Sequence, residues 1–293
     1  MSDGLSWYIA IVTTINILAM VWLIWWSAKG TYEQAGDDTG HVWDEDLKEN
    51  NNPLPRWWLW LFYGTIIFAF IYFALYGGLG KIQGVLDWSQ EDQWEQEVAQ
   101  AQEKYGPIFA HYAGMDLEAL AQDQGGREIG QRLYLNNCAV CHGSDARGAR
   151  GFPNLADDAW LYGSAPENVK QSILNGRNGV MPAGMVTGEG VDQVVAYVQS
   201  LSGRDTGASE QTLAQGKAKF AACAGCHGPE GKGNTALGAP DLTDDVWLYG
   251  GSPGAIRKSI VEGRNGVMPA FNGTLGEDKV HVVAGYILGL SRK

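Results

Sequence analysis

All four cysteines of this 293-residue chain lie in two short motifs that each end in a histidine. The first motif is C-A-V-C-H at residues 138–142, and the second is C-A-G-C-H at residues 223–227. C-x-x-C-H is the attachment signal of c-type haem. Two cysteines three positions apart on a helical turn point the same way and can form thioethers with the two vinyl groups of one haem, while the adjacent histidine binds the iron. We therefore predict two covalently bound haem c groups, attached through Cys138, Cys141, Cys223 and Cys226, with His142 and His227 as axial iron ligands.

Three other chemistries use paired cysteines. A zinc ribbon would need about 15–20 residues between the pairs, and 81 separate them here. Two disulfides are feasible in an oxidising compartment, but they would leave the two histidines unexplained. A thioredoxin-like redox motif requires a βαβ setting, and none is apparent. Two motifs within a duplication favour haem over all three.

An internal repeat supplies the second axial ligands. L-A-D-D-A-W-L-Y-G at residues 155–163 reappears as L-T-D-D-V-W-L-Y-G at residues 242–250, and G-R-N-G-V-M-P-A at residues 176–183 returns unchanged at residues 263–270. Met181 and Met268 hold matching positions in this repeat and are the predicted iron ligands. Met185 is the alternative in the first copy, but Asn272 stands at its counterpart. The repeat leaves open whether each methionine binds the haem of its own copy or of the other. His/Met ligation raises the reduction potential, and it leaves no vacant position for oxygen.

Several further residues could contact the haems. The loops before Pro153 and Pro240 could offer a carbonyl oxygen to the other ring nitrogen of each histidine. Aromatic and arginine side chains that recur in both copies are candidates for binding the haem propionates, although core packing or a solvated surface position explains them almost as well. These candidates are Trp160, Tyr162, Arg177, Trp247, Tyr249 and Arg264.

The elements that must position these residues begin with two apolar segments. Residues 5–28 and 57–80 contain no ionisable side chain, and as helices of 24 residues each would reach roughly 36 Å, enough to cross a hydrocarbon core of about 30 Å. Tryptophan pairs close the first segment and open the second, as at one membrane interface. The first segment lacks a basic n-region and an A-x-A cleavage site, so we interpret it as an uncleaved anchor rather than a signal peptide.

Charge is distributed unevenly along the chain. Lys29, Lys48 and Arg56 lie in the loop between the two segments, which predicts a cytoplasmic loop and haem domains on the outer side. Residues 82–126 hold nine acidic side chains against Lys104 alone, and we expect a helix, a turn at Gly106-Pro107 and a second helix that serve as a spacer or docking element. From residue 127 onward the charges balance, so no basic stripe suits nucleic acid.

The predicted fold is therefore all-α, with two N-terminal transmembrane helices and two small tandem haem domains. The expected segments are residues 1–28 (first transmembrane helix), 29–56 (cytoplasmic loop), 57–80 (second transmembrane helix), 81–126 (acidic helical linker), 127–205 (first haem domain) and 206–293 (second haem domain).

These motifs resemble a known family. Paired C-x-x-C-H domains that each carry W-L-Y-G and G-R-N-G-V-M-P-A are similar to class I cytochromes c. With the membrane segments and N-N-C-A-V-C-H-G-S-D at residues 136–145, the whole chain resembles the dihaem subunit of cbb3-type cytochrome c oxidases. Many such subunits have a single membrane span, so the additional span departs from the simplest pattern.

The resemblance implies a role in aerobic respiration. The subunit would take electrons from a periplasmic cytochrome c and deliver them to a monohaem cytochrome c subunit. The haem–copper catalytic subunit would then reduce oxygen and pump protons. The chain would sit in the bilayer of the bacterial inner membrane with its haem domains in the periplasm. As an isolated chain it would only carry electrons; as part of the complex it would belong to an oxidoreductase.

Other functions fit the same ligand set less well. A dihaem electron carrier of another respiratory membrane complex would use identical ligands, and only the family motifs favour the oxidase. A dihaem peroxidase needs an accessible iron, whereas both sixth positions are predicted to be filled. A structural protein with two disulfides and no haem is the third possibility.

Overall fold

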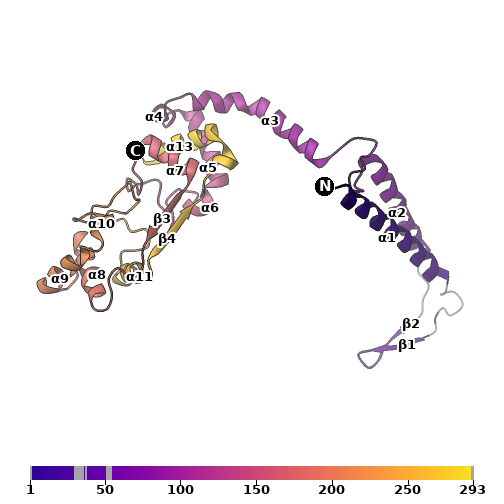
Figure 1. Cartoon of the computed structure of the whole chain (residues 1–293), viewed down its shortest axis with the longest axis horizontal. Coiled ribbons are helices and arrows are strands. Elements are labelled where there is room, and N and C mark those ends of the chain that lie inside the picture. The colour runs from indigo at the N-terminus through magenta and orange to yellow at the C-terminus, as the bar shows by residue number, and fades with distance from the viewer. Residues whose placement is uncertain (1, 30–35, 37, 51–54, 292–293) are drawn as a thin grey trace. The chain divides into compact units, whose positions relative to one another are not determined.

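The structure is a computed structural model that describes residues 2–29, 36, 38–50 and 55–291. It forms two compact units, residues 1–103 and 104–293, which are described separately (Figure 1). Most of the described residues are helical, as predicted, although four short strands accompany the helices.

The first unit contains the two apolar helices. Helix α1 spans Asp3–Lys29 and α2 spans Arg56–Tyr76, and both are long and apolar enough to cross a membrane. Helix α2 ends four residues before the predicted boundary because Gly77 adopts φ +77°, a conformation that glycine adopts at little steric cost. Between them, β1 (Asp38–Trp43) and β2 (Leu47–Asn50) form an antiparallel hairpin that the sequence analysis did not predict.

Helix α3 (Gln90–Ala113) runs through the predicted turn at Gly106-Pro107, so that prediction is wrong. Proline removes one backbone hydrogen bond from a helix, and here the turns on both sides continue. Beyond the proline, Tyr112 lies against Gly125 and Gly126 of the next long helix, a contact that holds the last turn of α3 in place.

The haem-motif region contains the remaining elements, in which the two copies of the repeat build corresponding helices and strands. They are α4 (Leu117–Leu120), α5 (Gln124–Asn137), α6 (Ala139–His142), α7 (Pro166–Asn175), β3 (Arg177–Met181), α8 (Gly190–Leu201), α9 (Glu210–Phe220), α10 (Ala224–His227), α11 (Pro253–Glu262), β4 (Arg264–Met268), α12 (Asn272–Leu275) and α13 (Glu277–Ser291).

Two hydrophobic cores organise these elements. The first core joins α4, α5 and α7 to the C-terminal helix α13, and the second joins α8, α9 and α11. Each core contains a close helix crossing at a glycine. A Cβ atom at Gly130 of α5 would lie 2.6 Å from Tyr286 Cβ of α13, and one at Gly216 of α9 would lie 2.8 Å from Tyr197 Cβ of α8. Only glycine allows the helices to approach this closely.

The cores do not follow the two copies of the repeat. The predicted division between residues 205 and 206 falls between α8 and α9, which pack against each other in the second core. The first core combines the start of copy one with the end of copy two, because α13 packs on α5 and α7. The second core is therefore a continuous stretch of chain inserted within the first.

Strands β3 and β4 connect the two cores. They lie side by side and pair antiparallel (Figure 1). Arg177 lies opposite Met268, Gly179 opposite Gly266, and Met181 opposite Arg264. Since the two strands have the same sequence, R-N-G-V-M, the pairing brings the two copies together about a local two-fold relation. Each strand ends at one of the two candidate methionines.

Candidate functional site

Each C-x-x-C-H motif folds into a single helical turn. Helix α6 begins after Cys138 and ends at His142, and α10 begins after Cys223 and ends at His227. The next residue in each case is a glycine with positive φ, Gly143 (+79°) or Gly228 (+76°), whose N–H closes the turn. Both cysteines of a pair therefore belong to the same turn as the histidine. All four cysteines are described, and none forms a disulfide.

The two histidines are buried and fixed by backbone carbonyls. His142 Nδ1 lies 2.9 Å from Pro153 O, and His227 Nδ1 lies 3.0 Å from Pro240 O. A carbonyl oxygen can only accept, so Nδ1 must be the donor and the lone pair lies on Nε2. This is the arrangement that metal-binding histidines use. A backbone carbonyl contact to each histidine is confirmed in both copies, but the acceptor is the carbonyl of the proline itself and not one of the loop before it.

Burial also affects the cysteine thiols. Desolvation, with a smaller contribution from Cys141, raises the pKa of Cys138 to about 11. Desolvation likewise raises the pKa of Cys223, with a smaller effect from Cys226. Both groups are thus held as neutral thiols near pH 7, unlike the activated thiolates of redox enzymes. This argues against the thioredoxin-like alternative.

Each methionine packs on the core that holds a haem-motif cysteine of the other copy. Met268 packs against the first core, which contains Cys138 of copy one. Met181 packs against the second core, on which Cys223 of copy two also packs. The chain beyond each strand continues onto the other copy, since Phe271 N donates to Ile173 O (3.0 Å) and Gly184 N donates to Ile260 O (2.9 Å). The alternative Met185 is an exposed side chain.

The candidate propionate residues form matching pairs in the two copies. Arg177 lies over the Tyr162 ring at 4.4 Å, and Arg264 lies over the Tyr249 ring at 4.3 Å. Each arginine Nε also donates to a serine hydroxyl, Ser172 or Ser259, at 2.9 Å. These serines were not predicted as site residues, although they hold matching positions in the two copies. Part of each guanidinium is thus engaged within the protein.

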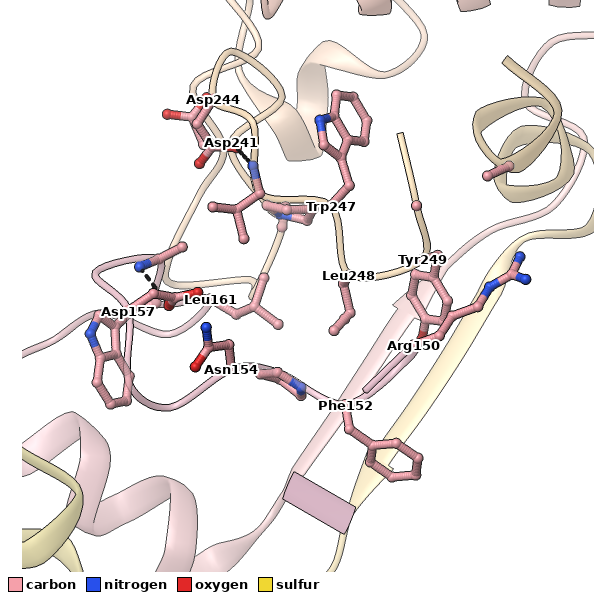
Figure 2. A pocket seen from close by; sticks show the side chains of 18 of the residues that line it. Arg150, Phe152, Asn154, Asp157, Leu161, Asp241, Asp244, Trp247, Leu248 and Tyr249 are labelled. Carbon is pink, nitrogen blue, oxygen red and sulfur yellow. Dashed lines mark hydrogen bonds between the residues drawn. The ribbon is translucent and has the colours of Figure 1, made fainter. Parts of the chain in front are cut away.

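A cavity of about 890 Å³ lies between the W-L-Y-G loops of the two copies. It is lined by Trp160, Trp247 and Tyr249, but not by Tyr162, Arg177 or Arg264. Figure 2 shows Trp247 and Tyr249 at this cavity, together with Asp157 and Asp244. Each of these two aspartates has a raised pKa, mainly because burial penalises its charged form.

Trp247 lines this cavity and has a buried polar atom in its indole ring. Trp247 Nε1 is buried and has no hydrogen-bond partner among the residues that the structure describes. A buried indole N–H usually finds an acceptor, and a haem carboxylate is one. Together with the free Nε2 atoms and the paired thiols, this shows that the residues present fit a covalently attached haem.

Comparisons with known proteins agree with this chemistry. Residues 35–83 match the family described as the N-terminal domain of cytochrome oxidase-cbb3, FixP. Residues 127–198 and 211–287 both match the family described as cytochrome c oxidase, cbb3-type, subunit III. These two segments follow the copies of the repeat and imply two cytochrome c domains with covalent haem c.

Similar proteins extend over nearly the whole chain. The cbb3-type cytochrome c oxidase subunit CcoP of Rubrivivax gelatinosus is 44% identical over 99% of this chain and 96% of its own length. The subunit FixP of Azorhizobium caulinodans is 38% identical over 85% of this chain and 91% of its own length. The subunit CcoP of Cereibacter sphaeroides is 36% identical over 90% of this chain and 98% of its own length.

Proposed function

We infer the role of the chain from its family, since it belongs to the subunit III proteins of cbb3-type cytochrome c oxidases, which are membrane-anchored dihaem electron carriers. We propose that it accepts electrons from a periplasmic cytochrome c. It then delivers them to a monohaem cytochrome c subunit, which feeds the haem–copper catalytic subunit. The helices α1 and α2 anchor it in the bacterial inner membrane, and both haem domains lie in the periplasm.

One observation carries this proposal. Each C-x-x-C-H turn holds a buried histidine whose Nδ1 is occupied by a proline carbonyl, and each of the two cores receives one methionine. Each site thus offers two thiols, one imidazole Nε2 and one thioether. When bound, a haem c supplies reversible one-electron exchange at its iron. A histidine and a methionine would hold the iron in each site, and no ligand position would then be left for oxygen, which suits electron transfer rather than oxygen chemistry.

The ligand assignment crosses between the copies. We assign Met268 to the site formed by Cys138, Cys141 and His142, because it packs on the core that contains Cys138. Met181 serves the site formed by Cys223, Cys226 and His227 for the same reason. The β3–β4 ladder holds both methionines at the ends of a rigid ribbon. This proposal chooses one of the two alternatives that the repeat left open.

The candidate residues for binding the haem propionates differ in how well the structure supports them. Trp247 has the strongest support, since its buried Nε1 needs an acceptor. Trp160 and Tyr249 line the same cavity. For Arg177 and Arg264 we propose only an indirect effect on the propionates, because each guanidinium stacks on the tyrosine of its own copy. The same holds for Tyr162, which does not line the cavity.

Purification of the tagged chain from membranes in mild detergent tests the proposed function. We expect an intact mass two haems above that of the polypeptide, and co-purification of a haem–copper subunit. The complex should oxidise reduced cytochrome c. A complex that contains Cys138→Ala and Cys141→Ala should lose this activity but still oxidise a small reductant that feeds the catalytic subunit directly. Cytochrome c oxidation at an unchanged rate would contradict the proposed electron path.

The same purification separates the alternative functions. Co-purification with a different respiratory complex would indicate that the chain is an electron carrier of that complex and not of the oxidase. A high-spin ferric haem in the intact chain would indicate an open iron and favour a peroxidase.

A further inference from the structure

Helix α3 carries an exposed apolar stripe that neither haem core uses. Trp94, Val98, Tyr105 and Ile108 are 62%, 46%, 47% and 42% exposed. With Ala101 between them, they follow spacings of four, three, four and three residues. At 100° per residue these side chains fall within about 40° of one line along the helix. This is the seam pattern of helices that pack against another helix.

The stripe continues into a contact that is already made. Tyr112, four residues after Ile108, lies on the same line and packs against Gly125 and Gly126 of α5. The C-terminal end of the stripe therefore acts as a helix-packing surface within this chain. The four side chains before it have the same spacing and remain exposed, so the surface is longer than the contact it makes.

Acidic side chains border the stripe. Glu91, Glu95 and Glu97 flank its N-terminal half, while Lys104 is the single lysine or arginine of the helix. Flanking charges of this kind select the partner of a helix seam. Two copies of the helix would repel each other, and a membrane surface with anionic lipids would also be repelled. The complementary surface is an apolar seam with lysine or arginine along its edges.

We propose that this stripe of α3 docks on a helix of another subunit of the oxidase, which presents an apolar seam flanked by basic residues. The inference rests on the proposed function, since it takes the occupant from the same complex. Docking would bury Trp94 and Tyr105, the kinds of side chain that dominate binding energy at protein interfaces. It would fix the acidic linker between the membrane anchor and the haem domains.

Site-specific photocrosslinking in membranes that hold the whole complex tests the proposal. A photoreactive amino acid replaces Trp94 or Tyr105 in the full chain, and Gln96, on the opposite side of the helix, serves as the control position. We expect adducts with another oxidase subunit at the two stripe positions, at a yield at least about fivefold above the control. Adducts with lipid, with a second copy of this chain, or at the control yield would overturn the proposal.

Paired substitutions give a second measurement. Trp94→Glu with Tyr105→Glu places two charges in the stripe, and Gln96→Glu with Ala99→Glu places two charges on the opposite side of the same helix. Glutamate is a good helix former, so both variants keep the helix and both haems. We expect the stripe variant to lose its partner at a detergent concentration that the control variant survives. Equal retention of the partner in the two variants would overturn the proposal.

The two failures can be distinguished. If the unmodified chain brings down no haem–copper subunit, the proposed function fails. If the unmodified chain does co-purify with the haem–copper subunit, but the crosslinks at Trp94 and Tyr105 reach no oxidase subunit, only the proposed docking surface is wrong.

Discussion

At the level of single residues, a backbone carbonyl decides which nitrogen of each histidine can bind a metal. Pro153 O and Pro240 O each accept from Nδ1, and proline suits the position because it fixes φ and has no N–H. The lone pair of Nε2 is then available in both copies. The sequence motif identifies the histidine, but the contact with a proline further along the chain fixes its tautomer.

The assignment of each methionine to the haem motif of the other copy leads to a prediction for single residues. In a chain with Cys223→Ala and Cys226→Ala, haem is attached only through Cys138 and Cys141. We expect Met268→Ala to open that iron to carbon monoxide and to lower its potential by on the order of 0.1 V, within the roughly 0.8 V range that axial ligands govern. Met181→Ala in the same chain should leave the iron closed. Visible spectra and redox titration measure both effects.

The parent chain with one haem is the control for folding, and it must itself show a low-spin spectrum without carbon monoxide binding. The opposite pattern, in which Met181→Ala opens the iron and Met268→Ala does not, would mean that each methionine serves its own copy.

A second prediction concerns the aspartates beside the cavity. Burial, with smaller effects from Asp241, Asp245 and Asp157, raises the pKa of Asp244. The folded state therefore binds this proton more tightly than the unfolded state, so its stabilising effect is present at low pH and is lost as pH rises through the raised pKa. Asp244→Asn should raise the melting temperature at pH 7 by about 1–3 °C, and the difference should shrink towards pH 4.

Asp205→Asn is a matched control, because Asp205 is exposed and its Oδ1 accepts from Gly207 N, much as Asp244 Oδ1 accepts from Val246 N. Melting curves across this pH range should leave the control unchanged. A gain for Asp244→Asn that is the same at pH 4 and pH 7 would mean that charge is not its cause.

At the level of helices and strands, the sequence predicts what each copy contains but not which copy it packs on. The apolar faces of α8 and α13 follow from the spacing of their valines, and the two membrane helices follow from their length and lack of charge. Local patterns are nearly the same in both copies, so α5 could accept either C-terminal helix. The choice depends on long-range packing and on the β3–β4 pairing, which no local pattern encodes.

The glycine crossings give a prediction at this level. Gly130→Val would place a side chain against Tyr286 Cβ and Val282 O, which a Cβ atom would approach to 2.6 and 2.9 Å. Overpacking of this kind costs about 1–3 kcal/mol, so the melting temperature should fall by about 3–10 °C. Gly254→Val is the control, since Gly254 has open space around it in α11. Equal losses in the two variants, measured by calorimetry, would mean that the α5–α13 crossing is not tight.

At the level of the whole molecule, the membrane anchor and the haem domains are separate structural units. No buried residue of either haem core precedes Leu117 among the residues described, whereas α1 and α2 present exposed apolar side chains along much of their length. The two cores, by contrast, are joined twice, through β3 and β4. Within each core an ion pair links the two copies of the repeat, Lys170 with Glu277 (2.9 Å) in the first and Arg257 with Asp192 in the second.

This architecture predicts how a shortened chain behaves. Residues 104–293, exported to the periplasm without the anchor, should form a soluble protein that carries two haems with the spectrum of the full chain. Because the second core is inserted within the first, unfolding either one frees both ends of the other, so calorimetry should record one transition rather than two. Two transitions that differ by more than about 10 °C would contradict the interlocked arrangement. They would mean that one core stays folded after the other has unfolded.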